Sequence, residues 1–484
     1  MCVLHPAQRV IYISVEQEQL YLTGFLLKKH NGKLVLRIED TDTERLKEDS
    51  VSQILTSLKW LGLNWDEGPE VGGEVGPYYQ SERREIYSKV AEQLLEEGKA
   101  YYCFCTSEIL EAEREKQRAA KQPFRYARTC RDLPVEEAKA RAAKGEPYSV
   151  RIKIPTEGNL TVHDLIHGDV TFDLTQFDDF VIVKTNGMPT YNFAVVVDDH
   201  LMRISHVLRA EEHLSNTPKQ VLLYEACGFA VPKFGHMPMI LAPDRSKLSK
   251  RHGATSVEEF REQGYLPEAI VNYLTLLGWA PGNEEEIFSL QDTVAQFELE
   301  KMSKKAAVYD TKKLTWMNGQ YLSALPLEAV LPEAKIFFIK SGLVDEAWLE
   351  ANKDYFARLV DVVRVRVKTL QEVVEAAEYF FKDVESYDEK GVGKHFKPEA
   401  AELLTVCINA LEALETFDLA STEAAYNKIA EEQGLSLGKV VHPTRLALTG
   451  RTVSPGLFDV MVLLGKETTL SRMRKAVQYI KALA

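Results

Sequence analysis

The segment Lys247-Leu-Ser-Lys-Arg251 says more about the fold and chemistry of this chain than any other stretch. Two lysines flank a small hydroxyl residue, and the segment follows an apolar, strand-like run, Met237-Pro-Met-Ile-Leu-Ala242. Clustered ammonium groups on a loop suit an oligophosphate, whose negative charge grows as a bond to phosphorus breaks. Taken alone, such a string is a weak signal, because short basic segments are usually solvated surface.

Two other segments give this string its weight. Leu36-Arg-Ile-Glu-Asp-Thr-Asp42 lies upstream, and Met302-Ser-Lys-Lys-Ala-Ala-Val-Tyr-Asp310 lies downstream, followed by Lys313-Leu-Thr-Trp316. In this order and at these spacings the segments resemble those of bacterial glutamyl-tRNA synthetase, a class I aminoacyl-tRNA synthetase. The resemblance extends from about residue 28 to the C-terminus.

Length, composition and charge set broad limits. A chain of 484 residues has room for about three domains. No apolar run reaches the ~20 residues of a membrane span, and a signal peptide is not evident, so we expect a cytoplasmic protein without a membrane segment. Six cysteines in this length do not indicate a disulfide framework. The net charge of −13 still permits RNA binding, which needs only a local basic surface. Nothing indicates more than a monomer.

Hydrophobic periodicity divides the chain into an α/β part and a helical part. Gly32-Lys33 and the next five residues predict a turn and a buried strand that ends in acidic residues, where open α/β sheets place ligands. Residues 149–183 alternate as strands, and after about residue 325 the spacing is helical. The resemblance implies an α/β, Rossmann-type class I synthetase catalytic domain with an α+β insertion, and an all-α C-terminal anticodon-binding domain. The expected domains are catalytic (1–80 with 191–245), acceptor-binding insertion (81–190), stem-contact region (246–325) and anticodon-binding domain (326–484).

The resemblance implies a reaction and its partners. Glutamate and ATP give glutamyl-adenylate and pyrophosphate, and the glutamyl group then passes to the 3′ end of tRNA(Glu). Mg²⁺ is expected alongside ATP. Whether tRNA(Gln) is also charged is left open by the sequence.

Three residues are expected to bind the amino acid. By resemblance, Glu39 holds the ammonium group of glutamate, Arg209 contacts the substrate side chain, and Tyr191 lines the same site. A guanidinium pairs bidentately with a carboxylate, which lets a site choose glutamate over the isosteric glutamine. The alternatives are a solvated carboxylate for Glu39 and a structural salt bridge from Arg209 to Glu211 or Glu212.

The basic segment is expected to bind ATP. The family's loop at Lys247–Arg251 closes over ATP during adenylate formation. We expect Lys250 to stabilise the departing pyrophosphate with the help of Lys247, while Ser249 and Arg251 shape the loop. A solvated surface loop is the alternative.

A cysteine group suggests a structural zinc site. Cys103-Phe-Cys105 and Cys130-Arg-Asp132 supply three thiolates and a carboxylate, and structural zinc takes four ligands. The pairing resembles the zinc knuckle of many bacterial members of the family, where histidine often stands at the position of Asp132. Tyr126 is another possible fourth ligand, and cysteines without metal are the alternative.

The N-terminus departs from the family's pattern. There the ATP-cradling signature reads approximately R-F-A-P-S-P-T-G, then H-I-G-G, whereas residues 1–27 contain neither a histidine pair nor a glycine pair. Codons read from the last base of each printed codon and the first two of the next permit that signature. We therefore predict a frameshift over residues 1–27, with the frame restored near Leu27–Lys29. As printed, the chain should bind ATP poorly or not at all, and a catalytically inactive tRNA-binding paralogue is the alternative function.

Overall fold

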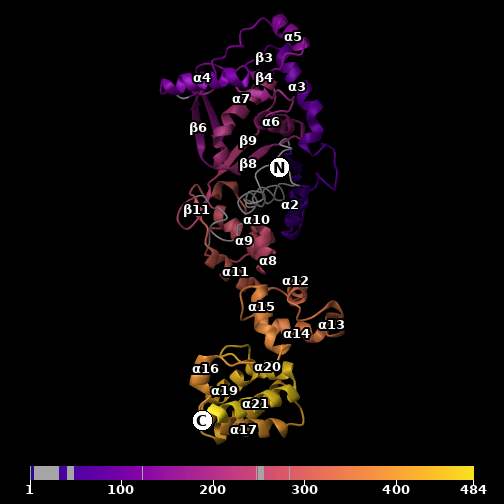
Figure 1. Cartoon of the computed structure of the whole chain (residues 1–484), viewed down its shortest axis with the longest axis vertical. Helices are drawn as coiled ribbons and strands as arrows, with labels where there is room; N and C mark the ends of the chain where they lie inside the picture. The colour runs from indigo at the N-terminus through magenta and orange to yellow at the C-terminus, as the bar shows by residue number, and fades with distance from the viewer. Residues whose placement is uncertain are drawn as a thin grey trace. The chain divides into compact units, whose positions relative to one another are not determined.

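The computed structural model describes the backbone of residues 2–4, 32–40, 48–122, 124–246, 248, 256–282 and 284–483 (Figure 1). The chain divides into two compact units. The first comprises Met1–Glu259 with Ile270–Asp310, and the second comprises Phe260–Ala269 with Thr311–Ala484. None of the described helices is both long and apolar enough to cross a lipid bilayer.

A four-stranded sheet is the main scaffold of the first unit. Its strand order is β6-β5-β9-β8, in which β5 and β6 are antiparallel while β5, β9 and β8 run parallel. Parallel strands end at one edge, where open sheets place ligand sites. This sheet combines strands from before and after residue 190, the expected end of the insertion. The domain limits expected from the sequence stay predictions. The strand bounds are β5 (Asn159–Asp164), β6 (Gly168–Asp173), β8 (His206–Ala210) and β9 (Lys233–Met237).

Two short parallel pairs contain segments singled out from the sequence. β1 (Cys2–Leu4) pairs with β2 (Leu36–Ile38), and all three residues of β2 are buried. β10 (Ile240–Leu241) pairs with β11 (Ala307–Val308). The second pair places the run that leads to Lys247 beside the segment Met302–Asp310, far along the chain.

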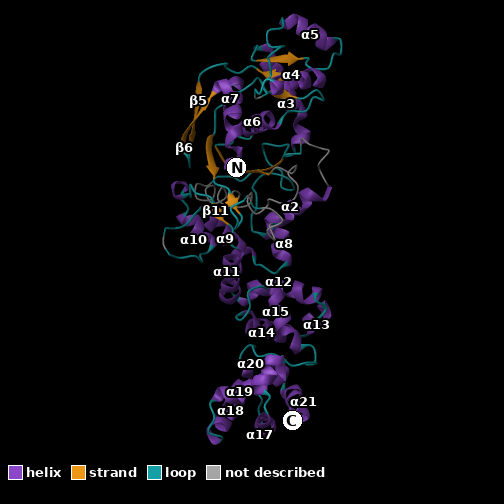
Figure 2. Ribbon diagram, turned by 60° about the vertical axis from the view of Figure 1, so that its left-hand side comes forward, coloured by secondary structure: helices purple, strands orange, loops and turns teal. Residues whose placement is uncertain are grey.

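The antiparallel sheet β3-β4-β7 shares an apolar core with the four-stranded sheet. The core includes Ile152 and Ile182 from this sheet, Phe234 from β9 and buried residues of α3, α6 and α7. Figure 2 shows α6 and α7 beside the strands β5 and β6. The strands expected within residues 149–183 are confirmed, and the apolar run after Asn186-Gly187 forms α6. The bounds in this unit are β3 (Ala100–Cys103), β4 (Ser149–Ile152), β7 (Val181–Val183), α2 (Glu48–Trp60), α3 (Arg84–Glu96), α4 (Ser107–Ala119), α5 (Val135–Ala143), α6 (Tyr191–Leu201), α7 (Thr217–Cys227), α8 (Val257–Glu262, which crosses into the second unit), α9 (Pro267–Gly278, which returns) and α10 (Leu290–Gln296).

The second unit is built from helices throughout its described residues 311–483, as expected. Helix boundaries follow local chemistry: Asp418 and Ser421 form a reciprocal capping box at the start of α18, and Gly450 takes a left-handed conformation (φ 71°) after α19. Tyr426 and Met461 lie in its apolar core. The bounds are α11 (Thr311–Ala324), α12 (Leu327–Lys340), α13 (Glu346–Ala351), α14 (Lys353–Arg364), α15 (Leu370–Ala377), α16 (Glu389–His395), α17 (Pro398–Glu412), α18 (Leu419–Glu432), α19 (Leu437–Thr449), α20 (Leu457–Leu464) and α21 (Lys466–Leu483).

Candidate functional site

Glu39, the expected ammonium ligand, is a buried carboxylate rather than a solvated one. It follows β2 directly and is only 2% exposed. Its Oε1 lies 3.1 Å from Nη2 of Arg37, which is itself 1% exposed. Burial raises the pKa of Glu39 to about 8, although Arg37 opposes the shift. Because burial makes ionisation of this carboxyl group unfavourable, a cationic ligand that pairs with it stabilises the ionised form.

Arg37 connects Glu39 to two more buried acids. Its Nη1 donates to Asp199 at 2.9 Å, and its Nε lies 3.5 Å from Asp198. Asp198 also accepts from Nε of Arg83 at 2.6 Å and from the hydroxyl of Tyr87 at 2.8 Å. This network fixes the base of the site through charge-assisted hydrogen bonds.

The residues of this network other than Glu39 were not predicted from the sequence. The acid pair Asp198-Asp199 could have indicated this network, because it directly follows the apolar run of α6. Acidic residues in a buried helix are expected to be paired.

Arg209 is expected to bind the substrate side chain, and its hydrogen-bond partners in the structure are neutral. On β8, its Nε donates to Nε2 of His236 at 3.1 Å and its Nη2 donates to Oγ1 of Thr217 at 2.8 Å. No carboxylate among the described residues lies within 4.0 Å of its guanidinium nitrogens. Glu211 instead accepts from the backbone N–H of Met239 at 3.3 Å, so the alternative of a structural salt bridge is not formed.

Tyr191 brings the acidic and basic parts of the site together. It is the first residue of α6, and its ring centroid lies 6.2 Å from that of His213. Burial raises the pKa of the Tyr191 phenol, with a further contribution from the negative charge of Glu39, while the positive charge of Arg209 opposes it. Burial lowers the pKa of Arg209, and the Tyr191 phenol counters that effect. The three residues expected at the amino acid site therefore interact electrostatically.

The expected ATP loop is described only at its entrance. Lys247, Ser249, Lys250 and Arg251 lie outside the described residues, as do residues 5–31, which include most of the aberrant segment 1–27. Leu248, which lies between Lys247 and Ser249, is described and is buried. The chain enters the loop from β10 through a turn in which Asp244 accepts from the backbone N–H of Ser246 at 2.9 Å.

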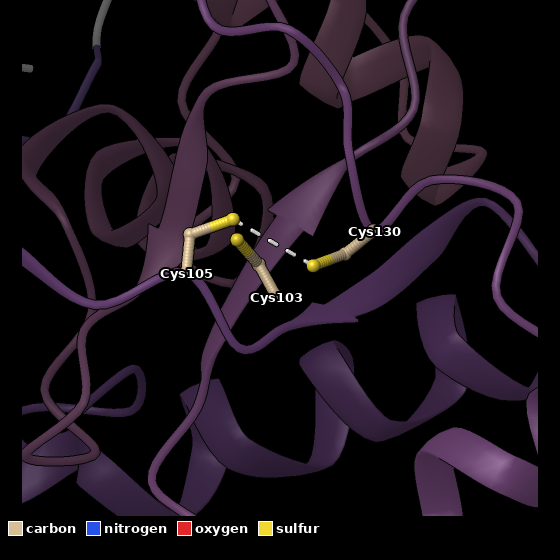
Figure 3. A group of neighbouring side chains, drawn as sticks. All are labelled: Cys103, Cys105 and Cys130. Atoms are coloured by element: carbon tan, nitrogen blue, oxygen red, sulfur yellow. Dashed lines mark hydrogen bonds between the residues drawn. The ribbon is translucent and has the colours of Figure 1, made fainter. Parts of the chain in front are cut away.

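The three cysteines expected to bind zinc converge in the insertion (Figure 3). Cys103 ends β3, while Cys105 and Cys130 come from flanking loops, and the three sulfur atoms lie within 4.8 Å of one another. The sulfur atoms of Cys105 and Cys130 are 3.7 Å apart. Tetrahedral zinc with Zn–S bonds of 2.3 Å implies a sulfur–sulfur distance of roughly 3.8 Å, so this spacing fits the metal.

The hydroxyl of Tyr126 completes this group. It lies 3.2 Å from Sγ of Cys103 and 3.7 Å from Sγ of Cys105. Hydrogen bonds from Cys130 and then Tyr126 lower the pKa of Cys103, while the same pairing with Cys103 raises the pKa of Cys130. Asp132 is exposed and does not belong to the group of possible ligand atoms within 4.8 Å. The structure thus brings Tyr126, rather than Asp132, to the thiols.

Comparison with protein families gives two matches. Residues 19–316 match the catalytic domain of the class I tRNA synthetases for E and Q, and residues 328–477 match an anticodon binding domain. The first match begins after residue 18 and so leaves out most of the segment that departs from the family's signature.

Curated relatives and solved structures agree with these matches. The chain is 53% identical to a glutamate–tRNA ligase of Moorella thermoacetica over 94% of this chain and 93% of the relative. It is 52% identical to a glutamate–tRNA ligase of Caldicellulosiruptor saccharolyticus over 93% of each. A crystal structure of a glutamate tRNA ligase from Elizabethkingia meningosepticum, in complex with its amino acid, superposes with a TM-score of 0.88 at 35% identity, covering 99% of this chain and 98% of that one.

Proposed function

The chain belongs to the class I glutamate–tRNA ligases, enzymes that join glutamate to tRNA at the expense of ATP, and from this premise we propose which residues bind the substrates. Glu39 binds the substrate ammonium group, Arg209 binds the side-chain carboxylate and Tyr191 lies between them. One observation carries this assignment: a buried acid and a guanidinium without a protein counter-ion among the described residues share one site. That charge pattern complements glutamate, which has a cation at one end and an extra anion at the other.

The chemical step follows from positioning and charge. The α-carboxylate of the bound glutamate attacks the α-phosphate of ATP, pyrophosphate leaves, and the adenylate then acylates the terminal adenosine of tRNA(Glu). We assign Lys250 to the developing charge of the pyrophosphate, with Lys247 assisting and Ser249 and Arg251 shaping the loop. Mg²⁺ accompanies ATP and shares this charge. Removing one such cation typically lowers the rate by about two to three orders of magnitude.

Zinc is proposed for the insertion. Cys103, Cys105 and Cys130 would hold it, with the Tyr126 hydroxyl as the fourth partner in place of Asp132. When bound, the metal crosslinks two loops that meet the end of β3, and its function is to stiffen the insertion.

The remaining assignments concern organisation and partners. We propose a cytoplasmic monomer whose residues 81–190 contact the acceptor end of tRNA, residues 246–325 its stem and residues 326–484 its anticodon. tRNA(Gln) is a possible second acceptor, to be tested by charging each tRNA separately. The frameshift over residues 1–27 is part of the proposal, because the printed residues supply no ATP cradle.

The substitution Arg209→Met tests whether Arg209 binds the side-chain carboxylate of glutamate. We expect the dissociation constant for glutamate to rise about 100-fold and the preference for glutamate over glutamine to disappear, since charged hydrogen bonds contribute about 1.5–3 kcal/mol each. Titration calorimetry on the full chain measures both ligands. The matched control is Arg203→Met, the same change at an exposed arginine of the same unit. An unchanged preference in Arg209→Met would overturn this assignment.

A further inference from the structure

We propose that Asp164, His236 and Thr217 are positioning residues that hold Arg209 through neutral acceptors only, so that the substrate carboxylate becomes its counter-ion. This inference rests on the proposed function, because it takes Arg209 as the residue that reads the glutamate side chain. It extends that function by explaining how the protein maintains an unneutralised guanidinium inside a buried site.

The sheet aligns these residues by its register. Arg209 on β8 and His236 on β9 are directly paired positions, so their side chains lie on the same face. Asp164 ends β5 and pairs with Phe234, two residues before His236. The guanidinium also lies 5.4 Å over the ring of Phe234. Three adjacent parallel strands therefore place an acid, an imidazole and a guanidinium in one row.

The hydrogen bonds fix where the protons are. Oδ2 of Asp164 lies 2.6 Å from Nδ1 of His236, and both side chains are fully buried. Because the carboxylate only accepts, the imidazole carries its proton on Nδ1, and Nε2 presents a lone pair to the Nε–H of Arg209. A protonated imidazole would have a donor at both nitrogens and would repel Arg209.

Asp164 is itself held in the ionised form. It accepts from the backbone N–H groups of Ile166 at 2.9 Å and His167 at 2.8 Å. Burial alone would raise the pKa of Asp164, but the hydrogen bonds from His236 and from these two N–H groups bring it below its usual value. Burial lowers the pKa of His236. The pair is thus a carboxylate with a neutral imidazole.

Thr217 supplies the second neutral acceptor. Its Oγ1 accepts from Nη2 of Arg209 at 2.8 Å, while its own proton is directed to the backbone carbonyl of His213 at 3.3 Å, because the single lone pair on Nε2 of His236 accepts from Arg209. The one acid of this row is thereby separated from the guanidinium by an imidazole ring. The arrangement orients Arg209 without neutralising it, and glutamine would leave the charge of this half-buried side chain unpaired.

The decisive test introduces a charge where the protein has a hydroxyl. Thr217→Asp places a carboxylate beside Nη2 of Arg209, and Thr217→Asn is the matched neutral control of nearly equal volume. Dissociation constants for L-glutamate and L-glutamine are measured by calorimetry on the full chain. We expect the preference for glutamate to fall at least tenfold in Thr217→Asp and to stay within threefold of the parent in Thr217→Asn. An unchanged preference in Thr217→Asp would overturn the proposal.

The imidazole is tested by a second pair of variants. His236→Phe removes the acceptor for Arg209, and His236→Gln retains an acceptor near the position of Nε2. We expect glutamate affinity to fall about tenfold in His236→Phe and to be largely restored in His236→Gln. His200→Phe is the matched exchange, because His200 stacks on Phe229 with centroids 3.7 Å apart and takes no part in this row. Equal losses in both His236 variants, with unchanged thermal midpoints, would contradict a positioning role.

Different results would overturn the substrate assignment of Arg209 and the role of its neutral acceptors. If Arg209→Met leaves the glutamate preference intact, or the parent binds no glutamate, both the reader assignment and this inference are wrong. If Arg209→Met abolishes the preference but Thr217→Asp does not, Arg209 still reads the substrate and only the counter-ion argument is wrong.

Discussion

Glu39 has an unusual charge state for a residue that we propose to bind an ammonium group. Its pKa of about 8 means that much of the carboxylate is protonated at neutral pH in the empty site. In the proposed complex the ammonium group of glutamate contacts the ionised form of Glu39, so at lower pH a proton has to leave Glu39 before glutamate binds. Binding therefore strengthens as pH rises through about 8.

The affinity for glutamate is therefore expected to depend on pH in a specific way. Between pH 7 and 8.5 the dissociation constant for glutamate should fall about eightfold, from the change in the ionised fraction of a group with this pKa. Calorimetry at fixed ionic strength measures it, and glutamine should show the same trend because it carries the same ammonium group. A Glu39→Gln variant should bind weakly and without this slope. A flat profile for the parent would contradict the assigned ligand.

Arg37 illustrates a contribution to stability rather than to substrate binding. Arg37→Met would leave Glu39, Asp198 and Asp199 buried without their shared cation. Breaking a buried ion pair by removing one partner costs about 3–5 kcal/mol in the free energy of unfolding. Urea unfolding measures the loss, and Arg114→Met, at an exposed arginine paired with Glu111, should change it by less than about 0.5 kcal/mol. Equal effects of the two changes would argue against the buried network.

Among single residues, the sequence predicts side chains that bind the substrate but does not predict the residues that support them. Glu39 and Arg209 stand in recognisable motifs, and the structure brings them near Tyr191. Arg37 and Asp199 are separated by 162 positions, and Asp164 and His236 by 72. Such pairings depend on strand order and register, which local residue patterns do not encode.

Helices and strands differ in how well the sequence predicts them, because helical spacing is a local pattern and strand order is not. The helical spacing expected after about residue 325 is confirmed, for example in α17 and α20. Both contain apolar residues at helical spacing that pack on one core. The order β6-β5-β9-β8 was not predicted, because it pairs strands that are separated by helices and loops.

The loops around β3 carry the proposed metal, and this makes a prediction about composition. The purified chain should contain about one zinc per molecule, measured by elemental analysis. Cys105→Ser should lose most of it, and Tyr126→Phe should weaken its retention against a chelator. Asp132→Asn should keep it, because Asp132 is exposed and outside the thiol group.

The control is Cys227→Ser, since Cys227 is a buried cysteine outside the cluster. Loss of zinc from Asp132→Asn together with its retention in Tyr126→Phe would show that Asp132 is the fourth ligand. A parent chain without zinc would contradict the metal site altogether.

For the whole molecule, the family and fold class expected from the sequence are confirmed by matches that cover residues 19–316 and 328–477 and by a solved relative with a TM-score of 0.88. The sequence motifs were sufficient to identify the family because they occur together, in one order and at matching spacings along the chain. The exception is the N-terminus, where the printed residues do not supply the family's ATP signature. The frameshift hypothesis predicts that the nucleotide sequence across codons 1–30 encodes that signature in the shifted frame.

Charging of tRNA(Glu) is the measurement that separates an active ligase from an inactive tRNA-binding protein. Two versions of the chain are compared, one with the printed residues 1–27 and one with the shifted-frame signature, each supplied with ATP, Mg²⁺ and labelled glutamate or glutamine. We predict that the shifted version transfers glutamate and rejects glutamine, and that the printed version is inactive or nearly so. Failure of the shifted version to charge tRNA(Glu) would contradict the ligase function of this chain, and full activity of the printed version would contradict the frameshift.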